Sequence, residues 1–104
     1  MSGGKDLKRD RFEKVNVEIG DIFVYSSSTK DEGDSLYLLE IVEHPLSKGN
    51  ISYNFRSGFK SFEEICLAAQ SEGKRIPRKL EFFPVTIHSE DRTLELDRKL
   101  RCWQ

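Results

Sequence analysis

The chain contains few of the residues from which catalytic and metal sites are built. Its 104 residues include only two histidines and two cysteines. Hydrolytic or transfer chemistry needs a nucleophile with a base in reach, a pair of carboxylates or a bound metal. The spacing of His44, His88, Cys66 and Cys102 matches no zinc pattern. We therefore predict no catalytic residue, no metal ligand and no cofactor.

Loop sites for phosphate and calcium are also missing from the sequence. Gly73-Lys74 precedes no serine or threonine and stands at the end of an expected helix, whereas phosphate loops open a helix. The acidic segment 31–34 lacks the further oxygen ligands and the terminal glutamate of a calcium loop. We interpret its charges as solvating a loop.

Long hydrophobic runs and paired cysteine motifs are absent too. No stretch approaches the length of a transmembrane helix, and residues 1–6 lack the apolar run of a signal peptide. Two cysteines without CxxC spacing fit reduced thiols better than a disulfide framework. We expect a cytoplasmic protein that does not bind membranes.

The residues that are present favour a small folded chain. Hydrophobic residues make up 37% of the sequence, charged residues 34% and aromatic residues 11%, and the net charge is −1. This balance predicts one compact core inside a charged shell. Residues 1–14 form a charged lead that we expect to be partly disordered, and residues 15–104 a single globular domain.

Alternating hydrophobicity predicts strands before the middle of the chain. Period two begins at Val15, and the segments 22–25 and 36–42 are apolar on both faces, as expected for central strands. The segment 51–56 alternates, which indicates one solvated face. Between the first two apolar segments, residues 26–35 are polar and predict a mobile loop.

A helix over about 61–72 is the clearest local prediction. Ser61 and Glu64 form the Ser-x-x-Glu capping pattern, and Gly73 stands where the helix needs a left-handed residue. The residues expected on its buried face are Phe62, Ile65, Cys66 and Ala69.

The last third of the chain predicts a further hairpin. Residues 80–88 form an extended segment in which Pro84 marks an edge or a bulge. The turn 89–92 returns the chain onto 93–96. The tail 97–104 fits either a helix or a strand, so both remain open.

The basic connector between the helix and this hairpin is the main functional hint. Lys74, Arg75, Arg78 and Lys79 place four cations within six residues without an acid. Together with Arg56, near Tyr53 and Phe55, they could contact phosphates while the rings stack on bases. The alternative is a solvated connector with both rings in the core. Trp103 either packs in the core or anchors a partner.

The order β-β-β-α-β-β predicts a mainly β, α+β fold: a small, strongly bent sheet or an SH3-like barrel. Residues 18–22, Glu-Ile-Gly-Asp-Ile, resemble the opening turn of such barrels, and a plain α+β meander is the alternative. In size and charge density alone, the chain resembles small accessory proteins of phages and plasmids.

The function that we predict is a non-catalytic protein-binding module, a small regulator or inhibitor that docks on a partner protein. An RNA- or DNA-binding module that uses the connector is the alternative.

Overall fold

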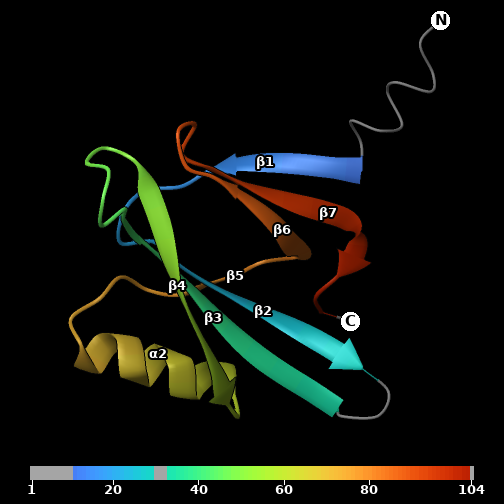
Figure 1. The fold of residues 1–104 in the computed structure, drawn as a ribbon. Helices are drawn as coiled ribbons and strands as arrows, with labels where there is room; N and C mark the ends of the chain where they lie inside the picture. Colours follow the sequence, from blue (N-terminus) through green and yellow to red (C-terminus); the bar gives the residue numbers. More distant parts are fainter. Residues whose placement is uncertain (1–10, 30–32, 104) are drawn as a thin grey trace, which may run out of the picture.

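The computed structural model describes residues 11–29 and 33–103 (Figure 1). This part of the chain is mainly β with one helix. The strands are β1 (Phe12–Asn16), β2 (Ile22–Thr29), β3 (Gly33–Glu43), β4 (Ile51–Phe59), β5 (Arg78–Lys79), β6 (Phe82–His88) and β7 (Thr93–Arg101). The helix, α2 (Phe62–Ser71), lies between β4 and β5 in the sequence.

The strands form two sheets. Sheet A has the order β1-β7-β6 and is antiparallel. Sheet B has the order β4-β3-β2-β5, in which β2, β3 and β4 are antiparallel neighbours and β5 pairs in parallel with β2. These described strands make no closed barrel, so the SH3-like barrel is not confirmed. The coarser prediction, a mainly β chain with one helix, is confirmed.

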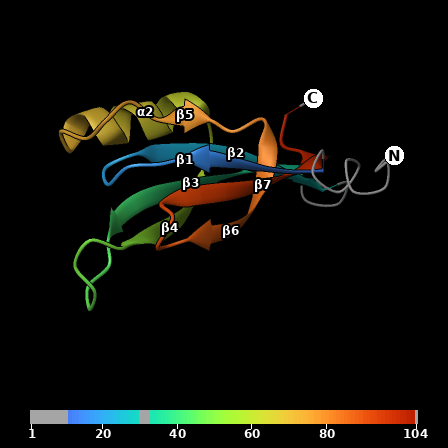
Figure 2. The same ribbon diagram turned by 90° about the horizontal axis from the view of Figure 1, so that it is seen from above.

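The strands β2 and β3, which are apolar on both faces, lie in the middle of sheet B, as predicted. One face of β2 and β3 presents Ile22, Val24, Leu36 and Leu38 to the helix. The opposite face presents Phe23, Tyr25, Leu39 and Ile41 to sheet A. Figure 2 shows α2 on one side of sheet B and β6 with β7 on the other. Two apolar clusters therefore share sheet B as their common wall.

Two sequence predictions need correction at strand ends. The polar segment 26–35 is not a long loop, because β2 continues to Thr29 and β3 begins at Gly33. Strand pairing needs backbone groups rather than apolar side chains, so the hairpin extends beyond the core. The charged lead was expected to reach Lys14, but β1 begins at Phe12 and pairs with β7. Residues 1–10 lie outside the described part.

The helix prediction is confirmed. The Ser61 Oγ atom accepts a hydrogen bond from the Glu64 backbone N–H at 3.2 Å. Gly73 has φ +70°, the left-handed conformation that ends the helix. Ile65 and Ala69 are buried against sheet B, while Phe62 and Cys66 are partly buried.

The predicted second hairpin is formed by β6 and β7, and the tail to Arg101 is strand rather than helix. β6 is an edge strand of sheet A, and its register shifts at Phe82/Phe83 and again at Pro84/Thr86. Pro84 thus lies on an edge strand and at a bulge, the two places where a missing N–H is tolerated.

Candidate functional site

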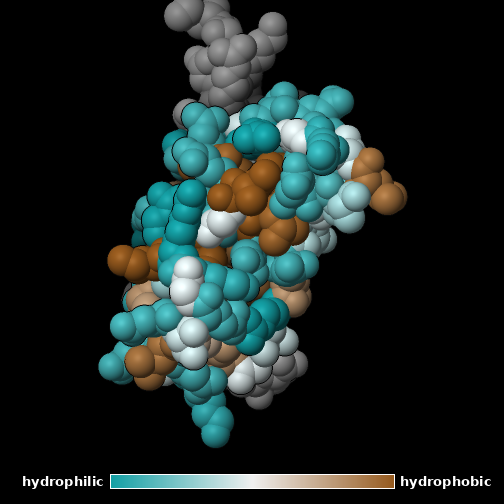
Figure 3. All heavy atoms as spheres, turned by 90° about the vertical axis from the view of Figure 1, so that its left-hand side faces the viewer, coloured by the Kyte–Doolittle hydropathy of each residue, from teal (hydrophilic) through white to brown (hydrophobic). Residues whose placement is uncertain are grey.

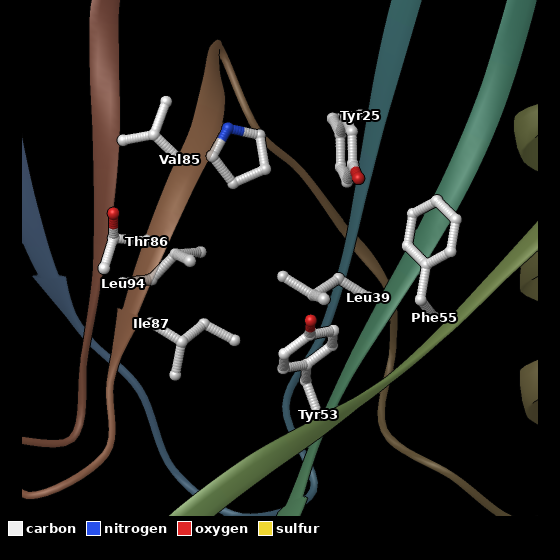
Figure 4. Close-up of a pocket in the computed structure, with 9 residues that line it drawn as sticks. Tyr25, Leu39, Tyr53, Phe55, Val85, Thr86, Ile87 and Leu94 are labelled. Atoms are coloured by element: carbon white, nitrogen blue, oxygen red, sulfur yellow. The ribbon is translucent and has the colours of Figure 1, made fainter.

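A groove opens between the two sheets, on the side where β4 and β6 are edge strands (Figure 4). Its volume is about 290 Å³. The residues that line it are Tyr25, Leu39, Tyr53, Phe55, Pro84, Val85, Thr86, Ile87 and Leu94. None of them carries a charge. The groove therefore suits apolar side chains or an uncharged ligand.

The alternation of β4 places its rings in this groove. Ile51, Tyr53 and Phe55 face sheet A, and Ile51 is fully buried. Tyr53 and Phe55 are 51% and 49% exposed, because sheet A ends at β6 and leaves that part of β4 uncovered. In Figure 4 these two rings lie on one side of the groove, and Val85, Thr86 and Ile87 lie on the other.

Aromatic rings pack on one another behind one wall of the groove. The ring centroids of Tyr25 and Tyr37 are 5.4 Å apart, as are those of Tyr37 and Phe55. Phe83 contacts Tyr25 with centroids 5.2 Å apart. These separations are typical of favourable ring pairs. Burial, followed by the nearby Tyr37, raises the pKa of Tyr25 to about 12.

The exposed edge of β4 can be read from the hydrogen bonds of β3. In an antiparallel strand, the N–H and C=O of one residue point to the same side, and successive residues alternate. The Ile41 N–H donates to the Asp21 carbonyl, and the Ile41 carbonyl accepts from Gly20, both on the β2 side. Even-numbered residues of β3 therefore bond to even-numbered residues of β4, as the His44–Asn50 bond also shows.

The odd-numbered residues of β4 consequently direct their backbone groups away from the sheet. They are Ile51, Tyr53, Phe55 and Ser57. At Gly58, with φ +92°, a register shift between Leu36 and Tyr37 ends this regular edge. The same residues that place rings in the groove thus offer unpaired backbone donors and acceptors beside it.

The basic connector has internal partners instead of forming a free cationic face. The Lys74 ammonium lies 3.0 Å from Glu40 and 3.1 Å from Glu72, and these contacts raise its pKa. Arg75 lies 2.7 Å from Asp21, and Arg78 lies 3.5 Å from the same carboxylate. The connector is therefore joined to sheet B and to the turn before β2.

The remaining predicted contact residues also pack against the protein. The Lys79 ammonium lies over the rings of Phe62 and Trp103, 4.9 Å and 4.7 Å from their centroids. Arg56 lies 3.6 Å from Glu72 and 5.3 Å from the Phe59 ring. The Trp103 Nε1–H donates to the Leu80 carbonyl at 2.7 Å, and the partly buried indole packs against the core. Arg56, Lys74 and Glu72 come together, but the connector does not join the groove.

The histidines and cysteines lie in separate places. His44 follows β3, and its Nδ1 atom accepts from the Leu46 N–H. His88 ends β6 with its Nε2 atom 2.7 Å from Glu95. Cys66 is on the helix and Cys102 is buried in the cluster between the sheets, where burial raises its thiol pKa. Within residues 11–29 and 33–103, no group of three His, Cys, Asp or Glu could hold a metal.

Sequence reasoning named Tyr53 and Phe55 but missed the opposite wall. Val85 is the extra residue of the bulge between Pro84 and Thr86, where the alternation of β6 changes phase. The signal available in the sequence was the apolar segment 80–88 with Pro84 inside it, because proline marks an edge strand or a bulge. On the face drawn in Figure 3, hydrophobic surface appears as separate patches among hydrophilic side chains.

Comparison with family models, with curated proteins and with solved structures gives no match. In the described part of the chain, no helix is long and apolar enough to span a membrane. The interpretation of the groove therefore depends on its geometry alone.

Proposed function

We propose that the protein is a non-catalytic protein-binding module, a small regulator or inhibitor that docks a partner protein in the groove between β4 and β6. The observation that carries the proposal is the coincidence of two features at one place. Tyr53, Phe55 and Val85 expose apolar surface there, and the β4 backbone beside them is unpaired. Exposed apolar surface and a free strand edge are each typical of protein interfaces.

Size supports a protein partner over a small molecule. A volume of about 290 Å³ is just below the range of small-molecule sites, which is roughly 300–1,000 Å³. It accommodates a few side chains of a partner. A larger hollow of about 530 Å³ lies between α2 and residues 73–77, but its charged members Lys74 and Arg75 already have carboxylate partners.

Nucleic-acid binding through the basic connector is the weaker alternative. Phosphate contacts would have to compete with the carboxylates of Glu40, Glu72 and Asp21 for the same cations. The free thiols of Cys66 and Cys102 agree with action in the reducing cytoplasm, which is part of the proposal.

The test places a photo-crosslinking amino acid at Tyr53 or at Val85 in the living source cell. The control position is Leu67, which is 66% exposed on the outer side of α2. We expect one discrete adduct from both groove positions and none from Leu67. The partner is then identified, purified and titrated against the wild type and the Val85→Asp variant.

We expect Val85→Asp to weaken binding by about tenfold or more, because it places a charge in an apolar site. The Leu67→Asp variant should bind like the wild type. Equal crosslinking at all three positions, or equal affinity of Val85→Asp and wild type, would contradict the proposal.

A further inference from the structure

We infer that the groove takes an extended segment of the partner that pairs with the edge of β4, and that this segment is apolar in its middle and acidic at its ends. The inference rests on the proposed function and specifies the partner's chemistry. It follows from a comparison of the sheet edges and from the charges around β4.

Among the described strands, β4 has the least protected edge. β6 contains Pro84 and two register shifts, which oppose pairing with another strand. β1 has five residues and β5 has two, so both are short. β4 has nine residues and no proline, and its irregularity is confined to Gly58 near its end. A partner strand would therefore add at β4.

The geometry of β4 fixes the spacing of the partner's apolar residues. The backbone N–H and C=O groups of Tyr53 and Phe55 point away from sheet B, and their side chains face the groove. In an antiparallel pair, directly opposite residues place their side chains on the same face. The partner residues opposite Tyr53 and Phe55 are two apart and point to the groove, which has an uncharged lining. We therefore expect the sequence in the middle of the partner segment to be apolar-x-apolar, where x is any residue.

The charges that flank β4 determine the ends of the partner segment. Residues 44–62 contain Lys48, Arg56 and Lys60 and no aspartate or glutamate. Lys48 and Lys60 are exposed and bracket the strand, and within the described ranges neither has an ion pair. Acidic residues at both ends of the partner segment would complement them.

The same charges disfavour two other occupants. A second copy that paired through its own β4 would bring lysines of like charge together at both ends. Single-stranded nucleic acid would also meet the lysines, but it needs ring faces open for stacking. The Phe55 ring is stacked on Tyr37, and both β4 rings lie along the groove between the sheets.

The test uses the labelled peptide EEDSVTVTVSDEE, whose acidic ends can reach Lys48 and Lys60 when its valines lie along Tyr53 and Phe55. We expect binding by fluorescence anisotropy, with amide shifts in NMR spectra concentrated on β4. Affinity should fall as salt is raised. Methylation of the central valine N–H groups should weaken binding by about tenfold, because outward backbone bonds are lost.

A charge-reversed pair of variants provides the matched control. The variant Lys48→Glu with Lys60→Glu should bind the peptide about tenfold more weakly or worse. The variant Lys14→Glu with Lys99→Glu makes the same charge change on sheet A, and it should bind like the wild type.

Three outcomes would overturn the inference: no effect of valine methylation, tighter binding of short oligo-uridine at the same residues, or dimerisation through β4 in light scattering. Crosslinking of a partner at Tyr53 and Val85 without peptide binding at β4 would also reject it, while the proposed function would stand. Absence of any groove partner would reject the proposed function instead.

Discussion

At the scale of single residues, ionisation of the Tyr25 hydroxyl makes the stability of the fold depend on pH. Burial raises its pKa from 10.0 to about 12 in the folded protein, whereas the unfolded chain keeps the ordinary value. The unfolded state therefore loses its proton first as the pH rises. The stability that this group contributes is complete below about pH 10 and is lost between about pH 10 and 12.

This gives a prediction for alkaline unfolding. The wild type should become progressively less stable in denaturant titrations between about pH 10 and 12, and a Tyr25→Phe variant should show a smaller loss. Tyrosinate absorbance should report one tyrosine that titrates late. Identical pH profiles for the two proteins would contradict this explanation.

Asp97 illustrates why residue-level partners were hard to foresee. This carboxylate is buried, and Arg11 binds it through two nitrogen atoms, 86 positions away in the sequence. The hydrogen bond from Arg11, followed by that from the Lys99 backbone N–H, lowers the pKa of Asp97. A charge pattern along the chain shows no such pair, because β1 and β7 meet only when sheet A forms.

At the scale of elements, the N-cap residue Ser61 stabilises the start of α2. Ser61 satisfies the Glu64 N–H, which would otherwise have no helical partner. We predict that Ser61→Ala lowers the free energy of unfolding by about 1 kcal/mol in thermal or denaturant melts. The matched Ser71→Ala change in the exposed last turn should stay within about 0.5 kcal/mol. Equal losses from the two variants would argue against the cap.

Most elements could be predicted because their signals are local. The Ser61 cap, the Gly73 stop and the two-faced apolar segments 22–25 and 36–42 each determine structure within a few residues. The outer part of the β2–β3 hairpin was assigned to a loop because its sequence is polar, although its ladder continues to the pair Thr29–Gly33.

The candidate site was predicted less well than the fold, because it depends on long-range placement. Tyr53 and Phe55 were recognised as either core or contact residues, but the opposite wall at Val85 required knowledge of the β6 bulge. The basic connector looked free in the sequence. Its partners Glu40 and Asp21 are 34 and 54 positions away, beyond any local pattern.

At the scale of the whole molecule, sheet B joins the two apolar clusters. The sole tryptophan, Trp103, packs against both of them. A shared wall predicts that the two clusters unfold together in one transition. Trp103 fluorescence and far-UV circular dichroism should therefore give the same unfolding transition.

We predict that Ile65→Ala, in the cluster under the helix, lowers stability by about 2–5 kcal/mol and leaves the two transitions coincident. Leu94→Ala, in the cluster between the sheets, should behave in the same way. Two separate transitions in either variant would show that the layers are independent units.

The crossover through α2 has a consequence for assembly. It carries the chain from the β4 edge of sheet B to the opposite edge, where β5 adds two residues in parallel beside β2. A fibre that grows by strand pairing needs a free strand edge on both sides of each sheet. Sheet B has one long edge, β4, and its other edge, β5, has only two residues. If a partner strand adds at β4 as proposed, addition on this sheet would stop after one step and would give complexes of fixed stoichiometry instead of open-ended polymers.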